Sequence, residues 1–178
     1  MQIMAKRRKN NRQKKNNKRR NLFLICAAVL LLSASVFIFN GQTEIIEPGD
    51  GVLATPVTEH DFGIVPVSMG VVSVEVPLVN IGDDDLIISF LDSSCGCTSA
   101  RVINGGDEGP VFGMSSHGKS PRDWKTLIEP EKQAILKIYY DPSVHRDFRG
   151  PATRVISITS NERSKPEKQV RIKVNQVD

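Results

Sequence analysis

From about residue 57 onward, apolar and polar residues alternate along short stretches of the chain. Successive side chains of a β-strand point to opposite faces, so an apolar residue at every second position indicates a strand with one buried face. The apolar sets are Val72, Val74, Val76 and Leu78; Leu86, Ile88 and Phe90; Ala134, Leu136, Ile138 and Tyr140; and Val170, Ile172 and Val174. In segment 154–159 the pattern does not decide which face is buried. The inward set is either Arg154, Ile156 and Ile158 or Val155, Ser157 and Thr159.

Two shorter stretches, 58–63 and 99–103, bring the number of predicted strands to about seven. Turn residues such as Asn80-Ile81-Gly82-Asp83 separate the strands. Pro77 favours an edge position or a bulge, because proline cannot donate a hydrogen bond to a neighbouring strand. We find no convincing amphipathic helix in this part of the sequence. The pattern therefore predicts an all-β, Ig-like antiparallel β-sandwich over residues 57–178.

Ahead of this domain, Leu22–Phe39 form an almost unbroken apolar run. A helix of this length spans roughly 27 Å, which is enough to cross a bilayer. Residues 1–21 contain ten Lys and Arg and no acidic residue, which predicts a disordered tail retained in the cytoplasm. We therefore expect an uncleaved signal anchor in the cell membrane, with the C-terminal domain outside the cytoplasm. A signal peptide cleaved near Ser33-Ala34-Ser35 is the alternative.

The net charge has a different meaning on each side of this predicted anchor. The whole chain carries +4, but without the ten basic residues of the tail, 14 basic and 20 acidic residues remain, a net charge of −6. We do not expect a domain of this charge to bind nucleic acid, and the tail lacks interleaved aromatic residues for base stacking. The predicted partners are the membrane, through Leu22–Phe39, and a protein on the cell surface or in the periplasm.

Two segments depart from the strand pattern. Residues 40–56 are rich in Gly, Pro and acidic residues and are predicted to form a linker. Residues 104–127 are too long for a hairpin turn and contain several glycines, so they are predicted to form a loop inserted into the sandwich. Phe112 and Trp124 indicate that this inserted loop packs against the domain.

Six short motifs occur in the order seen in a known bacterial family: His60-Asp61-Phe62-Gly63, Asn80-Ile81-Gly82, Leu86-Ile87-Ile88, Cys95-Gly96-Cys97-Thr98, Ile128-Glu129-Pro130-Glu131 and Tyr140-Asp141-Pro142. The domain resembles the family called domain of unknown function fifteen seventy-three, a relative of the Ig-like domains of Hydin and abnormal-spindle proteins. The resemblance implies an exported, non-catalytic sandwich and supplies no established activity. Two features depart from the family pattern: the inserted loop with its Phe112-Gly113-Met114-Ser115-Ser116-His117-Gly118 segment, and Glu-Pro-Glu at 129–131 where Pro-Gly is more usual.

Cys95 and Cys97 are the most compact group of chemically active residues in the sequence. On an extended strand, residues i and i+2 face the same side, so both sulfurs can lie together. Three interpretations stay open: small buried residues with a structural role, a strained and easily reduced disulfide, or a soft-metal site. Thiolate and thioether sulfur favour Cu(I), and imidazole suits copper or zinc. The hypothetical metal ligands are Cys95, Cys97, Met114, His117 and His145.

The sequence thus predicts a non-enzymatic binding or scaffolding module that requires no cofactor. The alternative is a copper-binding or thiol redox protein that uses the cysteine pair with the Met114 and His117 loop. A hydrolase built from Ser115 or Ser116 with His117 and Asp123 is disfavoured, because neighbours in a Gly-rich loop rarely have the geometry of a catalytic triad. The usual CxxC redox motif at a helix start is absent from the sequence.

Overall fold

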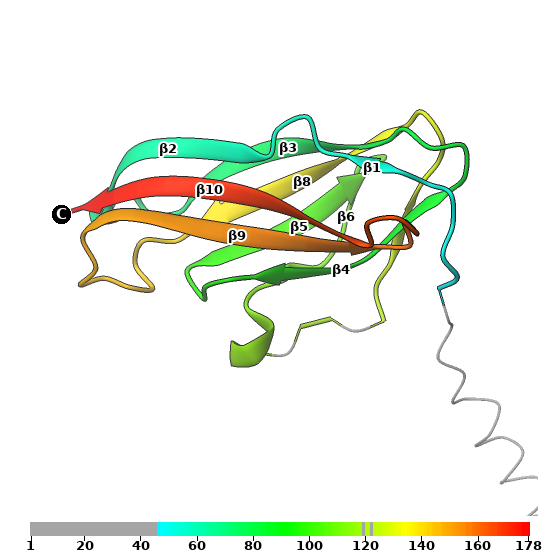
Figure 1. Cartoon of the computed structure of the whole chain (residues 1–178). Coiled ribbons are helices and arrows are strands. Elements are labelled where there is room, and N and C mark those ends of the chain that lie inside the picture. The colour runs from blue at the N-terminus through cyan, green and yellow to red at the C-terminus, as the bar shows by residue number, and fades with distance from the viewer. Residues whose placement is uncertain (1–45, 119, 122) are drawn as a thin grey trace, which may run out of the picture. The chain divides into compact units, whose positions relative to one another are not determined.

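Two five-stranded β-sheets face each other across a layer of apolar side chains (Figure 1). This computed structural model describes residues 46–118, 120, 121 and 123–178. The predicted tail 1–21, the anchor 22–39 and residues 40–45 lie outside the described residues, so these assignments stay predictions. Among the described residues, no helix is long and apolar enough to cross a membrane.

The strands of each sheet come from distant parts of the chain. The first sheet has the order β1 (Leu53–Ala54), β3 (Val72–Asn80), β8 (Gln133–Tyr140), β5 (Thr98–Asn104) and β6 (Asp107–Glu108). The second has the order β2 (Glu59–Pro66), β10 (Glu167–Val177), β9 (Gly150–Ser160), β4 (Leu86–Ser93) and β7 (Thr126–Ile128). All pairs of neighbouring strands are antiparallel except β2 and β10, which are parallel. Two 3₁₀ turns, η1 (Val67–Met69) and η2 (Ser115–His117), complete the described elements.

The predicted sandwich is confirmed. Seven of the described strands have seven residues or more, and β1, β6 and β7 are short additions. The apolar faces predicted for β3, β8 and β10 point into the core, and in β9 the inward face is the one that contains Ile156 and Ile158. Pro77 lies where β3 has a neighbour only in β8, because β1 pairs with Val79 and Asn80 alone. Proline is tolerated there for that reason.

The structure corrects two details of the sequence analysis. In β4 the predicted inward set Leu86, Ile88 and Phe90 holds only up to Ile88, because the register with β9 shifts between Ile88 and Phe90. A bulge of this kind moves later side chains to the other face, so Leu91 is fully buried in place of Phe90. The predicted linker 40–56 also ends earlier than expected, since Leu53 is buried and residues 53–54 form β1.

The inserted loop 104–127 packs against the sandwich, as Phe112 and Trp124 indicated. Phe112 is buried and pairs with Ala100, with 2.8 Å between Phe112 N and Ala100 O. Its ring makes edge contacts with Phe90 and Trp124. On either side of this anchor the chain forms β6, which pairs with β5, and β7, which pairs with β4.

The amide of Asn80 holds several turns together at one end of the sandwich. Its side chain is fully buried, and Oδ1 accepts hydrogen bonds from the N–H groups of Val52 and Gly82. Nδ2 donates to the carbonyls of Asp84 and Ile128, at 2.7 and 2.8 Å. A buried amide with both ends satisfied stabilises a fold, whereas an unsatisfied one costs about 1–3 kcal/mol.

Glu131 has a backbone conformation that normally favours glycine. Its φ is 62°, and it is the only described non-glycine residue with a positive φ. Lys132 N–H donates to the Glu129 carbonyl across the turn, and Pro130 occupies the position before Glu131. This arrangement fits a type II turn, whose third residue requires positive φ. The change from glycine in the family pattern to Glu131 therefore introduces local backbone strain.

We predict that Gly82→Ala destabilises the domain by about 2–4 kcal/mol, because the chain passes too close for a side chain. A Cβ at this position would lie 2.4 Å from the Asp50 carbonyl oxygen and 2.5 Å from Val52 N. Gly113→Ala is the matched control, since a Cβ there meets no atom within 4 Å. Urea unfolding followed by Trp124 fluorescence measures both variants. Equal stability of the two would contradict the close approach at Gly82.

Candidate functional site

The cysteine pair lies in the turn that connects β4 and β5. Ser93 Oγ donates to the Cys95 carbonyl at 2.9 Å and accepts a hydrogen bond from Cys95 N–H. Thr98 N–H also donates to the Cys95 carbonyl, at 3.1 Å. Cys95 and Cys97 are therefore held in a tight turn and not in the extended strand on which the sequence argument relied. The turn nevertheless brings both sulfurs to the same place.

Three potential ligand atoms converge at this turn. The Sγ atoms of Cys95 and Cys97 lie 2.6 Å apart, and Cys95 Sγ is 3.3 Å from His145 Nε2. All three atoms lie within 4.8 Å of one another. Cys97 is buried, Cys95 is half-buried and His145 is exposed, so solvent reaches the group from the side of His145.

Arg154 brings a positive charge to the buried sulfur. Its Nε donates to Cys97 Sγ at 3.3 Å. Burial, followed by the contact with Cys95, raises the pKa of the Cys97 thiol, while the contacts with Arg154 and Thr98 oppose that rise. Burial lowers the pKa of Arg154, but its contacts with the two cysteines outweigh this effect and raise it. The guanidinium thus stabilises negative charge on the sulfurs.

Strand β9 fixes the position of Arg154. Ser94 N–H donates to the Val155 carbonyl at 3.0 Å, and Val155 N–H donates to Ser94 Oγ at 2.9 Å. These two bonds join the middle of β9 to the cysteine turn. The guanidinium carbon also lies 5.9 Å from the centroid of the Phe148 ring, a distance typical of a cation–π contact.

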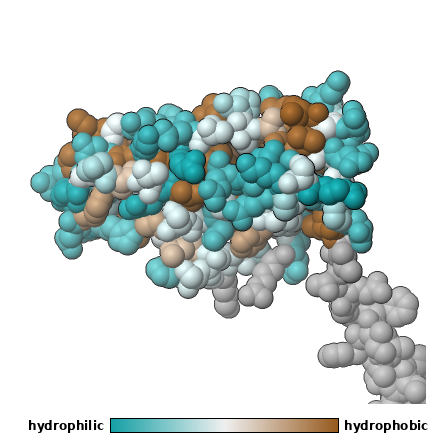
Figure 2. All heavy atoms as spheres, in the orientation of Figure 1, coloured by the Kyte–Doolittle hydropathy of each residue, from teal (hydrophilic) through white to brown (hydrophobic). Residues whose placement is uncertain are grey.

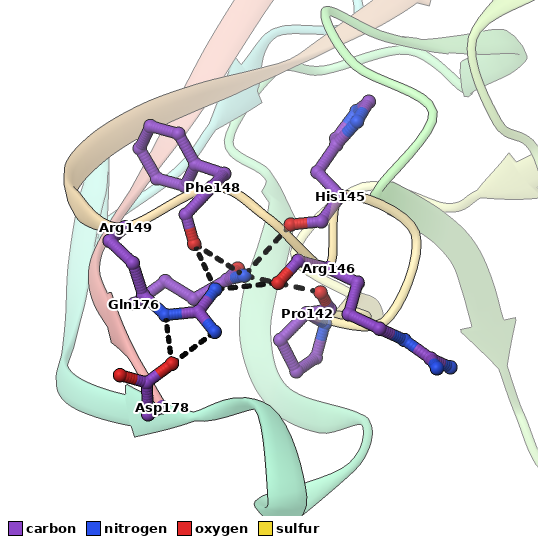
Figure 3. Close-up of polar contacts among 7 residues, drawn as sticks. All are labelled: Pro142, His145, Arg146, Phe148, Arg149, Gln176 and Asp178. Atoms are coloured by element: carbon purple, nitrogen blue, oxygen red, sulfur yellow. Dashed lines mark hydrogen bonds and ion pairs between the residues drawn. The ribbon is translucent and has the colours of Figure 1, made fainter.

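His145 belongs to the β8–β9 loop, which the side chain of Gln176 holds in place (Figure 3). Gln176 is fully buried, and its Nε2 lies 3.0–3.2 Å from the carbonyl oxygens of Pro142, His145 and Phe148. Its Oε1 accepts a hydrogen bond of 2.6 Å from the Tyr140 hydroxyl. One amide from β10 therefore gathers three carbonyls of the loop and fixes the backbone from which His145 projects.

A second group of contacts closes the same loop at the surface. Arg149 donates to the carbonyls of Arg146 and Phe148, at 2.5 and 2.7 Å, and forms an ion pair with Asp178 (Figure 3). Asp141 Oδ1 accepts hydrogen bonds from the N–H and the hydroxyl of Ser143. The loop is thus ordered by its own polar groups at both ends.

The inserted loop folds back over the cysteine turn. Ser115 N–H at the start of η2 donates to Asp92 Oδ1, and Ser93 N–H donates to the Gly113 carbonyl. A Cβ added to Gly96 would lie 3.8 Å from His117 Nδ1, so the His117 ring lies beside the turn. His117 is not part of the group formed by Cys95, Cys97 and His145. Met114 precedes η2, where its carbonyl accepts a hydrogen bond from His117 N–H.

Of the five ligands predicted from sequence, the structure thus brings Cys95, Cys97 and His145 together; whether any of the five binds a metal stays a prediction. Sequence reasoning missed Arg154 as a site residue. The available signal was a charged residue in the same period-two set as Ile156 and Ile158, the set that turned out to face inward.

His60 makes an edge contact with the Phe62 ring, with 4.7 Å between the two ring centroids. It lies in β2, where the pairing with β10 shifts register after Asp61. Gly63 follows with φ 66°, and its N–H donates to Asp61 Oδ1. The His60-Asp61-Phe62-Gly63 motif therefore forms a bulge in an outer strand.

A shallow hollow of about 390 Å³ lies next to Cys97. Val71, Val111 and Val144 line it and are between 44% and 57% exposed. Arg101 also lines it, and its buried Nε has no hydrogen-bond partner among the described residues. Apolar side chains and an unsatisfied donor thus border the cysteine turn.

Comparison with known proteins supports the family and the fold. Residues 53–111 match the family described as "Protein of unknown function (DUF1573)", which confirms the resemblance over the segment that contains the His60 and Cys95 motifs. No curated protein matches the chain.

Among solved structures, a protein of unknown function from Porphyromonas gingivalis W83 has the same fold, with a TM-score of 0.54 and 17% identity. The match covers 76% of this chain and 51% of that one, so the chain spans about half the length of that protein. The ASH/PapD-like domain 7 of human CEP192 has a TM-score of 0.45 at 15% identity, covering 77% of this chain and 92% of that one. The E. coli chaperone DraB has a TM-score of 0.41 at 7% identity, covering 71% and 56%.

We predict that Gln176→Leu destabilises the domain by about 2–4 kcal/mol, because the Tyr140 hydroxyl and three loop carbonyls lose a buried partner. Amide hydrogen exchange in the loop 141–149 should also accelerate. Gln169→Leu on the same strand is the control, since Gln169 is exposed. If the loop amides of Gln176→Leu exchange as slowly as those of the control, Gln176 does not hold the loop.

Proposed function

We propose that this chain, whose residues 53–111 match the DUF1573 family, is a membrane-anchored, extracytoplasmic Ig-like module that binds a soft metal ion without catalysing a reaction. The observation that carries the proposal is the convergence of Cys95, Cys97 and His145 within 4.8 Å. These residues come from two connections between strands, and the ordered turn and loop described above hold them together.

The donor set favours Cu(I). Two thiolates and one imidazole form a three-ligand group, whereas a structural zinc site almost always has four protein ligands. Thiolate sulfur is among the ligands that select Cu(I). The tight turn keeps the two sulfurs in one place before any metal arrives, which limits the ordering entropy lost on binding. The sulfurs would have to move apart from 2.6 Å to bind one ion, because metal–sulfur bonds are about 2.3 Å long.

The same two sulfurs can also be joined by oxidation, which is the basis of the thiol redox alternative. A disulfide across one intervening residue is expected to be easily reduced. Such a bond would remove both thiolate ligands, so a metal-binding form requires the reduced pair. A free-thiol count therefore has to accompany every metal measurement.

We predict that the reduced full-length chain binds one Cu(I) per molecule in an anaerobic titration against a coloured competing chelator. Cys95→Ser and Cys97→Ser should each weaken binding by about 100-fold or more, and His145→Ala by about 10-fold, because each removes one ligand. Cys26→Ser is the matched control and should bind as the unaltered chain does. Absence of binding by the reduced chain, or undiminished binding by Cys97→Ser, would refute the proposal.

A second candidate function is protein binding at the hollow beside Cys97. Three exposed valines line the hollow and favour a partner that supplies an apolar side chain. On the face shown in Figure 2, hydrophilic residues predominate and apolar residues gather in small separate groups. An extended peptide segment of another exported protein has the required chemistry.

For this candidate, we expect a photo-crosslinker in place of Val144 to join the chain to one defined protein in intact membranes. The crosslink should be lost when Val71→Asp is added, because a charged side chain then replaces an exposed apolar one that lines the hollow. A crosslinker at Val57, which does not line the hollow, is the control. The same products from both positions would show that the hollow has no specific partner.

A further inference from the structure

Arg154 is the only cation that the structure places in hydrogen-bonding contact with the cysteine sulfurs among the described residues. Of the ion pairs between described residues, none includes Arg154. Its other contacts are the Thr153 carbonyl and the Phe148 ring, neither of which carries a formal charge. No carboxylate among the described residues therefore pairs with the guanidinium, and its charge acts mainly on the cysteine sulfurs.

We propose that Arg154 makes the group of Cys95, Cys97 and His145 selective for a monovalent soft cation over a divalent one. This inference rests on the proposed function, since it concerns the charge of the bound ion. Arginine stays protonated at all accessible pH values, so its charge is a fixed property of the site.

The selectivity follows from the net charge of each complex. Two thiols and a neutral imidazole carry no net charge, and metal binding releases both thiol protons. A bound Cu(I) therefore leaves a complex of −1, which Arg154 neutralises. A bound Zn(II) gives a neutral complex, and Arg154 then leaves one uncompensated positive charge beside it. Because Cys97 and part of Arg154 are shielded from solvent, this difference is only weakly screened by water and salt.

The size of the effect can be bounded from Coulomb's law. One unit of charge at roughly 5 Å, with an effective dielectric constant of about 20, changes an equilibrium constant by roughly 300-fold. Water on the exposed side of the site screens the charge and reduces this change in the equilibrium constant. We therefore expect Arg154 to change the ratio of Cu(I) to Zn(II) affinity by about 10- to 100-fold.

The test compares the affinities of the reduced full-length chain for Cu(I) and Zn(II) in competition titrations. Arg154→Met should weaken Cu(I) binding at least about 10-fold and leave Zn(II) binding unchanged or tighter. Arg154→Lys keeps the charge and should restore most of the Cu(I) preference. Arg163→Met makes the same change of net charge far from the cysteines and should alter neither affinity. Thermal unfolding without metal shows whether each variant is folded.

The outcomes separate this inference from the proposed function. If the unaltered chain binds Cu(I) and only Arg154→Met shifts the ratio of affinities, both stand. If Arg154→Met weakens the binding of Cu(I) and Zn(II) equally, or changes the binding of neither, the selectivity proposal is overturned. Arg154 then at most positions the ligands. If the unaltered reduced chain binds no Cu(I), the proposed function itself fails, and this inference fails with it.

Discussion

The pairing of β5 with β8 is the contact on which the geometry of the site depends. Thr98 lies opposite Tyr140, and one residue further the Asp141 N–H donates to the Cys97 carbonyl at 2.8 Å. Because of this register, β5 begins and β8 ends at the same end of their sheet. The turn that holds the cysteines and the loop that holds His145 therefore emerge side by side, although 50 residues separate Cys95 from His145. A shift of one residue would turn the side chains to the other face and separate the three ligand atoms.

Two buried amides stabilise the opposite ends of the sandwich in the same way. Asn80 gathers the chain around the end of β3, and Gln176 gathers the loop after β8. Both side chains are fully buried, and in each both the oxygen and the nitrogen form hydrogen bonds. The apolar core fixes how the sheets pack, whereas these amides fix the connections. His145 lies on the connection that Gln176 fixes, so the precision of the candidate site depends on a polar contact and not on the core alone.

Much of the fold could be predicted from sequence, because period-two alternation directly reports which side chains of a strand are buried. The pattern failed at Phe90, where a bulge changed the phase, and at Leu53, where a strand of two residues is too short to show alternation. The site was only partly predictable. Cys95 and Cys97 are neighbours in sequence, but the approach of His145 depends on strand register, and the contact of Arg154 depends on how β9 joins the turn. The approach of His145 has no local signal, whereas Arg154 is marked only by its place in the inward-facing set with Ile156 and Ile158.

The inserted loop has a consequence for how the domain behaves near its neighbours. Its two short strands, β6 and β7, occupy the outer position in one sheet each, and β1 does so on the other side of the first sheet. Among the described strands, β2 lies at a sheet border along its whole length, and β3 does so over residues 72–78, because β1 pairs only with Val79 and Asn80. The bulge at Gly63 disrupts the regular pairing of β2, and Pro77 lacks an N–H for a new partner of β3. Unpaired strand borders are templates for edge-to-edge aggregation. The insertion would thus help to keep copies of the domain apart, independently of anything that the cysteines bind.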